Sequence, residues 1–544
     1  MKRFFRHLVE RIENAPLTLG SFVVTFLGLI LVRLTIENAL GLFPEHSLFF
    51  LFFEFTHTLL FFLCSFLLML PIVRYAGRLT LSQAGNVLLF GFLIIWTPPI
   101  IDTLIFQGRH FWSFYEFDGL SGLFVRFFTL FGDTPDIGIT YGVRIEVVLV
   151  TLALGLYTYL KSQRLTRSLF VALLTYTVLF VLGTFPSWIT FFVLSLEKSL
   201  LAIGSTDIAA LFLSPERILG RDLTDFRSVL NFKMSLVYGL LAVGLSALTL
   251  YRSQPRHFLA LIKNARVPQL IYHAGLLFLG MHLAFFFAEG HVSFEFFHSI
   301  GILSLLLATW CAWMASVVLN DLHDTTIDRL TNPARPLVEH TIGESEYRTY
   351  GILFFLFSLL LSGIVSFSAM LLLLSYQALA TLYSAPPLRL KQYPGLATLL
   401  AAMAGMLVLV AGAVSVAPTH NISDLPLSLL TYLFLAYFLA LPLKDFKDIE
   451  GDRADQVYTI PVLLGAERGK QVIGSLLFLL FTLSPLVLAL RMLFFPALLF
   501  GSFAFFAVQK GTSDEHSFFA YRKFPRLILG ITTLYGLVIV SFII

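Results

Sequence analysis

The chain has 544 residues, of which 57% are hydrophobic and only 13% are charged, and its mean hydropathy is +0.85. Soluble proteins carry about 25% charged residues, so this composition excludes a soluble globular enzyme, a disordered protein and a secreted disulfide scaffold. The net charge of +4 is too evenly balanced to indicate nucleic-acid binding. Cys64 and Cys311 lie within apolar segments, and we expect them to be packing residues without a disulfide.

Apolar segments of about 20 residues, the length that crosses a bilayer as a helix, recur along the whole chain. The first half contains about six of them and the second half about nine, so the predicted fold class is an all-α polytopic membrane protein. The predicted spans of the first half lie near residues 17–36, 48–73, 80–106, 143–160, 168–194 and 232–251. Those of the second half lie near residues 268–288, 297–319, 347–366, 367–383, 395–416, 424–443, 468–490, 492–508 and 524–544.

The charges between the predicted spans follow the positive-inside rule, by which cytoplasmic loops are rich in Lys and Arg. Residues 1–16 are basic and lack a clear small-residue cleavage site, so we expect a cytoplasmic leader rather than a cleaved signal peptide. Loops rich in Lys and Arg then alternate with loops such as 37–47 and 417–423, which contain neither residue. The pattern predicts a multi-pass protein of the cytoplasmic membrane with its N-terminus in the cytoplasm.

Ionisable residues within or near the spans of the first half are candidates for function, because a charge inside a membrane is costly. They are Arg33, Glu54, His57, Asp102 and Glu146. Glu54 and His57 share a helix face. They form either a proton relay or acceptor contact, or a polar pair that holds helices together, and we favour the polar pair. Pro98 and Pro99, just before Asp102, should break or kink the third span.

The segments 107–142 and 195–231 look amphipathic, and we expect them to lie on the outer surface as interfacial helices. The polar and basic stretch 252–268 is the best candidate for a domain boundary. We therefore predict an N-terminal membrane domain, residues 1–251, and a second membrane domain, residues 252–544. The first is either a fused partner that supplies or removes a lipid substrate, or a structural addition that fixes assembly.

An acidic cluster follows the predicted span at 297–319, in the segment NDLHDTTIDRL. At 100° per residue, positions 320, 324 and 328 share one helical face and position 321 lies close to 324. The cluster consists of Asn320, Asp321, Asp324 and Asp328. Packed carboxylates repel one another unless a cation lies beside them, and all-oxygen ligands favour Mg²⁺ or Ca²⁺. The alternative is a solvated acidic loop.

A second acidic cluster follows the span at 424–443, where Asp445, Asp448 and Asp452 again share one face. The two clusters are four spans apart, so the topology places both on the cytoplasmic side. Two carboxylate sets that meet at one membrane face indicate a pair of Mg²⁺ ions around an anionic ligand. The nearby cations Arg335 and Lys444 suit a diphosphate, because a guanidinium binds phosphate oxygens in a bidentate way.

Between the clusters lies the segment YSAPPLRLK, which contains Tyr383, Ser384, Arg389 and Lys391. The topology places this segment on the same face as the acidic clusters. Taken alone, it is equally well explained as a proline-stiffened loop that obeys the positive-inside rule.

Together these motifs resemble a known family. NDxxDxxxD followed by RP, then YSxPPLRLK, then KDxxDxEGD closing with TIPVLLG is similar to the UbiA superfamily of intramembrane prenyltransferases, over residues 255–544. The resemblance implies a bundle of nine transmembrane helices whose central cavity is capped by the two Asp-rich loops. It also implies Mg²⁺-dependent transfer of a prenyl chain from a polyprenyl diphosphate.

The resemblance implies roles for individual residues. The expected metal ligands are Asn320, Asp321, Asp324, Asp328, Asp445, Asp448 and Asp452. The expected catalytic residues are Asp321, Asp324, Tyr383, Asp445 and Asp448. The expected substrate-binding residues are Arg266, Asn320, Arg335, Ser384, Arg389, Lys391 and Lys444, with Lys263 and Asn264 as further candidates near the diphosphate.

The function implied is transfer of a prenyl group to an aromatic, quinone-precursor or lipid acceptor inside the membrane, with two Mg²⁺ ions as cofactor. The partners expected are a polyprenyl diphosphate, the acceptor and the lipid bilayer. The alternative is a multi-span transporter or lipid-handling protein whose acidic loops bind ions. The sequence disfavours a transporter, because the acidic clusters lie at helix ends whereas coupling sites usually lie at the bilayer midplane.

Overall fold

The computed structural model describes residues 2–543 except 41–47, 106–114, 133–137, 289, 291, 294, 326–327, 330–331, 394, 448 and 455–457. The described chain is almost entirely helical, and its strands β1 (Glu216–Ile218) and β2 (Arg221–Leu223) pair with each other. It packs into two compact units. Unit 1 comprises Met1–Ile218, Asp222–Phe258 and Glu295–Ile300, and unit 2 comprises Leu219–Arg221, Leu259–Phe294 and Gly301–Ile544.

Fourteen helices among the described residues are long and apolar enough to cross a membrane. This confirms an all-α polytopic membrane protein. Six of these helices end at or before Ser253 and eight begin after it. The ninth expected span of the second half, 524–544, coincides with α24 (Phe524–Ile543), a helix outside those fourteen. The division into six and nine spans therefore stays a prediction.

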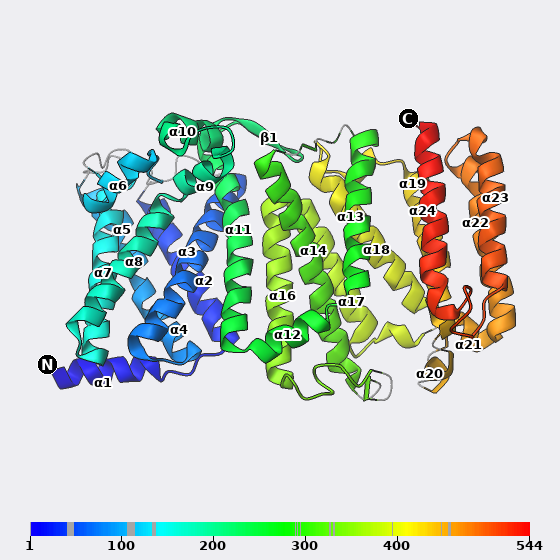
Figure 1. The fold of residues 1–544 in the computed structure, drawn as a ribbon, viewed down its shortest axis with the longest axis horizontal. Helices are drawn as coiled ribbons and strands as arrows, with labels where there is room; N and C mark the ends of the chain where they lie inside the picture. Colours follow the sequence, from blue (N-terminus) through cyan, green and yellow to red (C-terminus); the bar gives the residue numbers. More distant parts are fainter. Residues whose placement is uncertain are drawn as a thin grey trace. The chain divides into compact units, whose positions relative to one another are not determined.

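Unit 1 is built around the long helix α3, which contacts α2, α4, α7, α8 and α11. Its core is rich in aromatic rings, with Phe26 and Phe66 packed edge to face at 5.8 Å. The bounds of its helices are α1 (Lys2–Glu13), α2 (Leu19–Ala39), α3 (Leu48–Gly77), α4 (Leu81–Gly91), α5 (Thr97–Ile105), α6 (Leu120–Phe128), α7 (Tyr141–Ser162), α8 (Leu165–Gly183), α9 (Phe185–Leu194), α10 (Ser205–Leu213) and α11 (Phe226–Ser253). Figure 1 shows the long helices of this unit running side by side.

Two predicted spans of unit 1 are interrupted near prolines. The third predicted span is interrupted by a 3₁₀ turn, Phe92–Trp96, before α5 begins with Pro98 and Pro99 in its first turn. This confirms the predicted break, because proline has no N–H to donate to the preceding turn. The predicted continuous span 168–194 is wrong: the chain breaks at Thr184, and Pro186 lies at the start of α9.

The helices of unit 2 lie side by side in Figure 1. Their bounds are α12 (Pro255–Lys263), α13 (Val267–Phe287), α14 (Phe296–His323), α16 (Glu344–Val365), α17 (Phe367–Ser384), α18 (Leu396–Val416), α19 (Leu427–Ala440), α20 (Ile449–Ala454), α21 (Ile460–Leu464), α22 (Ala466–Val487), α23 (Phe494–Gln509) and α24, with a 3₁₀ segment, η5, at Leu441–Lys447. The first residues of α12 and of α14 belong to unit 1.

Helices α13 and α18 approach so closely in unit 2 that two positions require glycine. A Cβ added at Gly280 would lie 1.8 Å from the carbonyl oxygen of Leu409, and one added at Gly412 would lie 2.1 Å from that of Leu277. Small residues at such crossings let membrane helices pack backbone to backbone. This crossing holds α13 beside α18, and α18 in turn packs against α17 and α19.

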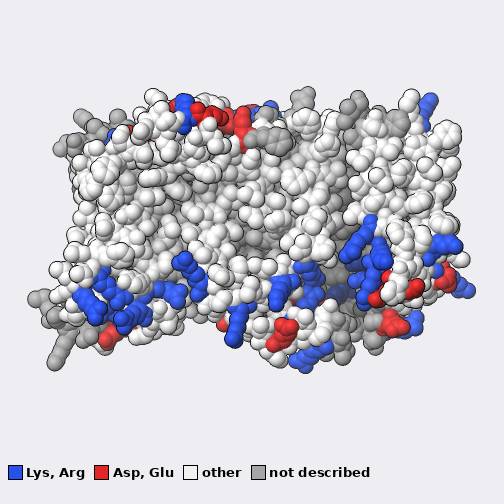
Figure 2. All heavy atoms as spheres, viewed as in Figure 1, with Lys and Arg blue, Asp and Glu red and all other residues white. Residues whose placement is uncertain are grey.

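Lys and Arg side chains gather at one end of the helices in each unit taken by itself (Figure 2). In unit 1 this end carries Arg74, Arg78, Lys161 and Arg164, which follow α3 and α7 or lie in their last turns. In unit 2 it carries Arg266, Arg335, Arg389 and Lys391, beside the acidic end of α14. Each unit is therefore polarised along its helices.

Candidate active site

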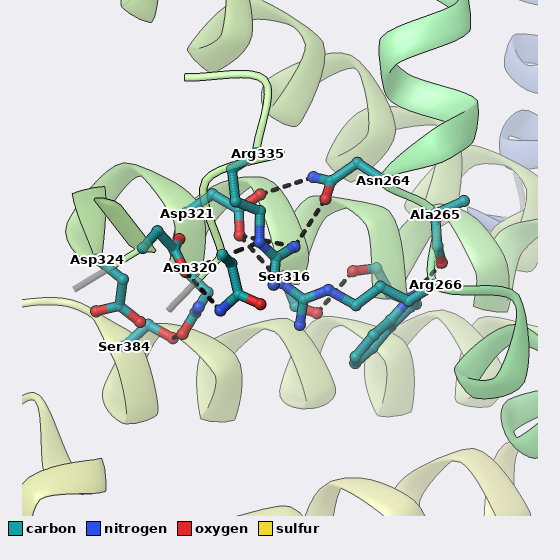
Figure 3. A network of polar contacts seen from close by, with 12 residues as sticks. Asn264, Ala265, Arg266, Ser316, Asn320, Asp321, Asp324, Arg335 and Ser384 are labelled. Carbon is teal, nitrogen blue, oxygen red and sulfur yellow. Dashed lines mark hydrogen bonds and ion pairs between the residues drawn. The ribbon is translucent and has the colours of Figure 1, made fainter. Parts of the chain in front are cut away.

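The first acidic cluster lies where α14 ends. Asp321 is in the last turn of that helix and is only 1% exposed. Its Oδ2 accepts hydrogen bonds from Asn264 Nδ2 at 2.7 Å and from the Tyr347 hydroxyl at 2.8 Å. Its Oδ1 accepts a hydrogen bond from Arg266 Nη2 at 3.1 Å. The carboxylate is held from several elements at once, and Figure 3 shows this network from close by.

Asp324 faces the basic loop that follows α17. Arg389 Nη2 donates to its Oδ1 at 3.0 Å, and the Lys391 ammonium forms a short ion pair with its Oδ2. The amide oxygen of Asn320 accepts hydrogen bonds from Ser384 Oγ at 3.1 Å and from Lys391 Nζ at 3.4 Å. The structure therefore brings the YSAPPLRLK segment onto the first acidic cluster.

Burial lowers the pKa of Lys391, although the adjacent Asp324 acts to raise it. Asp328 also acts to raise this pKa and Arg389 acts to lower it, so the Lys391 ammonium lies among charges of both signs.

Arg335 connects the two sides of the cluster. Its Nη1 donates to Asn264 Oδ1 at 2.7 Å and lies 3.5 Å from Asp321 Oδ1, while its Nε lies 3.8 Å from Asp328 Oδ1. Asp328 is buried, and burial raises the pKa of its carboxyl, although Arg335 acts to lower it. One guanidinium thus contacts two acidic residues of the motif and the amide that positions one of them.

Several buried polar atoms at this site have no hydrogen-bond partner among the described residues. They are Asp328 Oδ2, Arg266 Nε and Arg389 Nε. An unpaired carboxylate oxygen suits a cation, and unpaired N–H donors suit an anion. Leaving such groups buried without a partner is costly. The residues present therefore fit a divalent cation together with a phosphate-bearing anion.

The second acidic cluster is described only in part. Lys444 and Asp445 lie in η5, where Lys444 is exposed and Asp445 is half-buried, and both have interaction partners. Asp448 lies outside the described residues, and so does the side chain of Asp452 in α20. Convergence of this cluster on the first one stays a prediction. Tyr383, half-buried in the last turn of α17, lies next to Ser384, and its catalytic role likewise stays a prediction.

The sequence analysis missed Tyr347 and gave Asn264 only a minor place. Asn264 lies between α12 and α13, 57 residues before Asp321, and Tyr347 lies in the first turns of α16, 26 residues after it. Tyr347 is fully buried. The sequence contained only weak signals that these residues contact Asp321. Asn264 is a polar residue in a basic stretch before a span, and Tyr347 lies near the start of a span.

The model of the UbiA prenyltransferase family matches residues 276–524. The digeranylgeranylglyceryl phosphate synthase of Thermococcus sibiricus is 27% identical over 204 residues, which cover 36% of this chain and 68% of the relative. The chloroplastic chlorophyll synthase of Arabidopsis thaliana is 30% identical over 178 residues, which cover 31% of this chain and 46% of the relative.

A solved structure of a UbiA homolog from Archaeoglobus fulgidus, bound to GPP and Mg²⁺, aligns with a TM-score of 0.41 at 20% identity. The alignment covers 52% of this chain and 99% of that one. The N-terminal half matches no family model. The family match confirms the resemblance noted in the sequence: residues 276–524 match the model of the UbiA prenyltransferase family, which supports an enzyme of the prenyltransferase type.

Proposed function

We propose that residues 252–544 transfer a prenyl group from a polyprenyl diphosphate to a lipid or aromatic acceptor in the membrane, in a reaction that depends on Mg²⁺. The observation that carries this proposal is that an unpaired carboxylate oxygen and unpaired guanidinium N–H donors lie together at the end of α14. Within the described ranges, a buried carboxylate oxygen of Asp328 lacks a donor, and the Nε groups of Arg266 and Arg389 lack acceptors. A magnesium diphosphate satisfies both kinds of group together.

The cations of the site would bind the diphosphate oxygens. Arg335 and Arg266 approach from one side of Asp321, and Arg389 and Lys391 approach from the side of Asp324. Each of these cations pairs with a carboxylate in the structure, so a diphosphate would take over existing partners. The cation-binding oxygens would come from Asn320, Asp321, Asp324 and Asp328, completed by Asp445, Asp448 and Asp452. Bound Mg²⁺ would neutralise the charge that develops on the leaving diphosphate.

The reaction breaks the bond between the allylic carbon and the diphosphate oxygen and forms a bond between that carbon and the acceptor, which loses a proton. The chain's part is to bind the leaving group and to exclude water from the allylic carbon. Aromatic rings line the interior of unit 2 near this end: Tyr272 stacks on Tyr437 at 5.4 Å, and His273 lies 4.9 Å from the ring of Trp313. Such π faces stabilise a carbocation.

The acceptor class is proposed from the relatives. The names of the relatives include digeranylgeranylglyceryl phosphate synthase, chlorophyll synthase and homogentisate phytyltransferase. We therefore propose a prenylated glycerol phosphate as the first acceptor to test, with chlorophyllide and homogentisate after it. An ion-coupled transporter remains the alternative, and it predicts no release of diphosphate.

The test is release of diphosphate from geranylgeranyl diphosphate by the purified full-length protein, with and without Mg²⁺, against each acceptor. We expect release that requires both Mg²⁺ and one acceptor. Asp324→Asn and Asp448→Asn should each lower the rate by about 100-fold or more, because each removes charge stabilisation of the leaving group. Rates like those of the wild type in both variants, with folding verified, would contradict the metal-diphosphate assignment.

A further inference from the structure

Unit 1 contains a cavity that the proposed prenyl transfer does not use. Its volume is about 280 Å³, close to the lower end of the range of about 300–1,000 Å³ that is typical of small-molecule sites. It lies among α2, α3, α4, α5, α7 and α11, so a ligand in it would be surrounded by helices of this one unit.

Much of the cavity wall is apolar and aromatic. Side chains that line this part include Phe61, Phe62, Met69, Phe92 and Leu154. Such a wall accepts a hydrocarbon chain or ring through the hydrophobic effect, as small-molecule sites commonly do.

The charged side chains of the wall gather at one end. Glu37 lies in the last turn of α2 and Asp102 in the last turn of α5, whereas Glu54 and Glu146 lie in the second turns of α3 and α7 and Arg227 in the first turn of α11. Because two of these helices end where the other three begin, the charged groups share one end of the helix bundle. The cavity is therefore amphipathic, with a charged end and an apolar remainder.

The charged end carries an excess of carboxylates. Arg33 bonds Glu37 at 3.1 Å and the carbonyl oxygen of Ile95 at 3.1 Å, and it lies 4.0 Å from Glu146. Arg227 bonds Glu54 at 3.1 Å. Both arginines of the wall are thus already paired with carboxylates, and an anionic ligand would meet repulsion here.

Two of the ionisable residues singled out in the sequence bond to other segments of this wall. Glu54 also accepts a hydrogen bond from Asn231 Nδ2 at 2.8 Å, and His57 bonds the Tyr115 hydroxyl at 2.7 Å. These contacts tie α3 to α11 and to the segment before α6, which agrees with the favoured role of Glu54 and His57 as polar residues that hold helices together.

The wall also offers an acceptor without a donor. Asn231 is 1% exposed, and while its Nδ2 bonds Glu54, its buried Oδ1 has no hydrogen-bond partner in the part of the chain that the structure describes. A buried amide oxygen is normally hydrogen-bonded. A ligand that donates a hydrogen bond at the charged end would satisfy it.

We propose that unit 1 binds an amphiphile with a hydrocarbon part and a head group that donates hydrogen bonds and carries no negative charge, namely a long-chain alcohol or a long-chain amine. This function is separate from prenyl transfer. It also excludes a polyprenyl diphosphate as the ligand of unit 1, because the four carboxylates of the cavity wall outnumber its two arginines.

The test uses the purified full-length protein and three photoreactive probes that share one C20 chain and end in a hydroxyl, a primary amine or a phosphate. Sites of crosslinking are mapped by peptide sequencing, and affinity is measured by competition with the unlabelled compound. We expect saturable crosslinking of α3, α4 or α7 by the alcohol or the amine, and binding of the phosphate there that is weaker by about tenfold or more. Equal crosslinking of these helices by the phosphate would overturn the proposal.

A matched pair of variants separates this cavity from other apolar surfaces. A Cβ added at Gly91 or at Gly28 meets no atom within 4 Å, but Gly91 lines the cavity and Gly28 does not. Gly91→Leu should therefore fill the cavity and lower affinity by about tenfold or more, while Gly28→Leu should bind as the wild type does. Unchanged binding in a folded Gly91→Leu protein would overturn the proposal.

A further variant distinguishes the two head groups. Glu146 lines the cavity and lies 4.0 Å from Arg33, farther from this guanidinium than Glu37 is at 3.1 Å. Glu146→Gln should weaken binding of the amine and spare the alcohol if the head group lies beside Glu146, and should leave both unchanged if it lies away from this carboxylate. Either result supports the proposal, whereas stronger binding of the amine in this variant would contradict it, because removing a carboxylate cannot increase attraction for a cation.

Discussion

At the scale of single residues, the site depends on side chains that touch the acidic motif without belonging to it. Asn264 donates a hydrogen bond to Asp321 at 2.7 Å and accepts one from Arg335 at 2.7 Å, so one amide orients both a carboxylate and a guanidinium. Asn264→Leu removes both contacts while keeping similar volume. We expect the rate of diphosphate release to fall by about 10- to 100-fold, because a buried hydrogen bond to a charged group is worth about 1.5–3 kcal/mol.

The control for this variant is Asn421→Ala. Asn421 lies in an exposed loop, and its side chain accepts a local hydrogen bond from the backbone N–H of Ser423. The control variant should keep the wild-type rate. Equal rates in Asn264→Leu and Asn421→Ala would show that Asp321 is positioned without the amide.

Arg335 tests whether the shape of a cation matters as well as its charge. Its guanidinium reaches Asn264, Asp321 and Asp328 together. A lysine ammonium keeps the charge but cannot form the planar fork. We expect Arg335→Lys to raise the KM for the prenyl diphosphate by about tenfold, which corresponds to one lost charged hydrogen bond. The matched control is Arg329→Lys, at an exposed arginine of the same segment. A similar KM in both variants would contradict the role of the fork.

At the scale of helices, the close crossing of α13 and α18 holds α13 in place, and α13 begins directly after Arg266 of the site. A Cβ at Gly412 would lie 2.1 Å from the backbone oxygen of Leu277, an atom that cannot rotate away. Gly412→Ala should therefore separate the helices and lower the free energy of unfolding by about 1–3 kcal/mol, the usual cost of overpacking. The measurement is thermal unfolding in detergent.

Gly275 of α13 is the matched control for this crossing, because a Cβ added there meets no atom within 4 Å. Gly275→Ala should leave stability unchanged or raise it by a few tenths of a kcal/mol, since alanine favours the helix by about 0.5–1 kcal/mol. Equal melting temperatures for the two variants would mean that the crossing tolerates a methyl group.

The same scale shows what the sequence could predict and what it could not. The period of one helix placed 320, 324 and 328 on one face, and the structure does bring Asn320, Asp321, Asp324 and Asp328 to the end of α14. Periodicity says nothing about residues from other helices. The bonds from Asn264 and Tyr347 to Asp321 arise from tertiary packing across 57 and 26 residues, and they could not be derived from local spacing.

In the N-terminal half, too, the sequence identified residues but not their tertiary neighbours. The sequence identified Arg33, Glu54, His57, Asp102 and Glu146 as ionisable residues in spans, and all of them line one cavity. It could not show that they share a cavity, because they come from four helices whose neighbours are set by packing. The partners that satisfy them, such as Arg227, come from yet another helix.

At the scale of the whole molecule, the charge at the helix ends predicts an orientation in the membrane. Basic residues gather at one end of the helices in each unit (Figure 2), and such ends normally face the cytoplasm. The two native cysteines are buried, so we expect little labelling of the wild-type chain by a thiol reagent. Single cysteines can therefore report which side each end of a helix faces.

We expect Ser195→Cys and Ser423→Cys, at exposed positions away from the basic ends, to react with a membrane-impermeant maleimide in intact cells. Gln163→Cys and Gln392→Cys, at exposed positions beside the basic ends, should react only after the membrane is permeabilised. The reason is that lysine and arginine are retained on the cytoplasmic side during insertion. Because each unit contributes one position of each kind, labelling of Gln392→Cys but not of Gln163→Cys in intact cells would mean that the units have opposite orientations. That result would also contradict the even number of spans predicted before residue 252, whereas the expected pattern would place the acidic end of α14 on the cytoplasmic side.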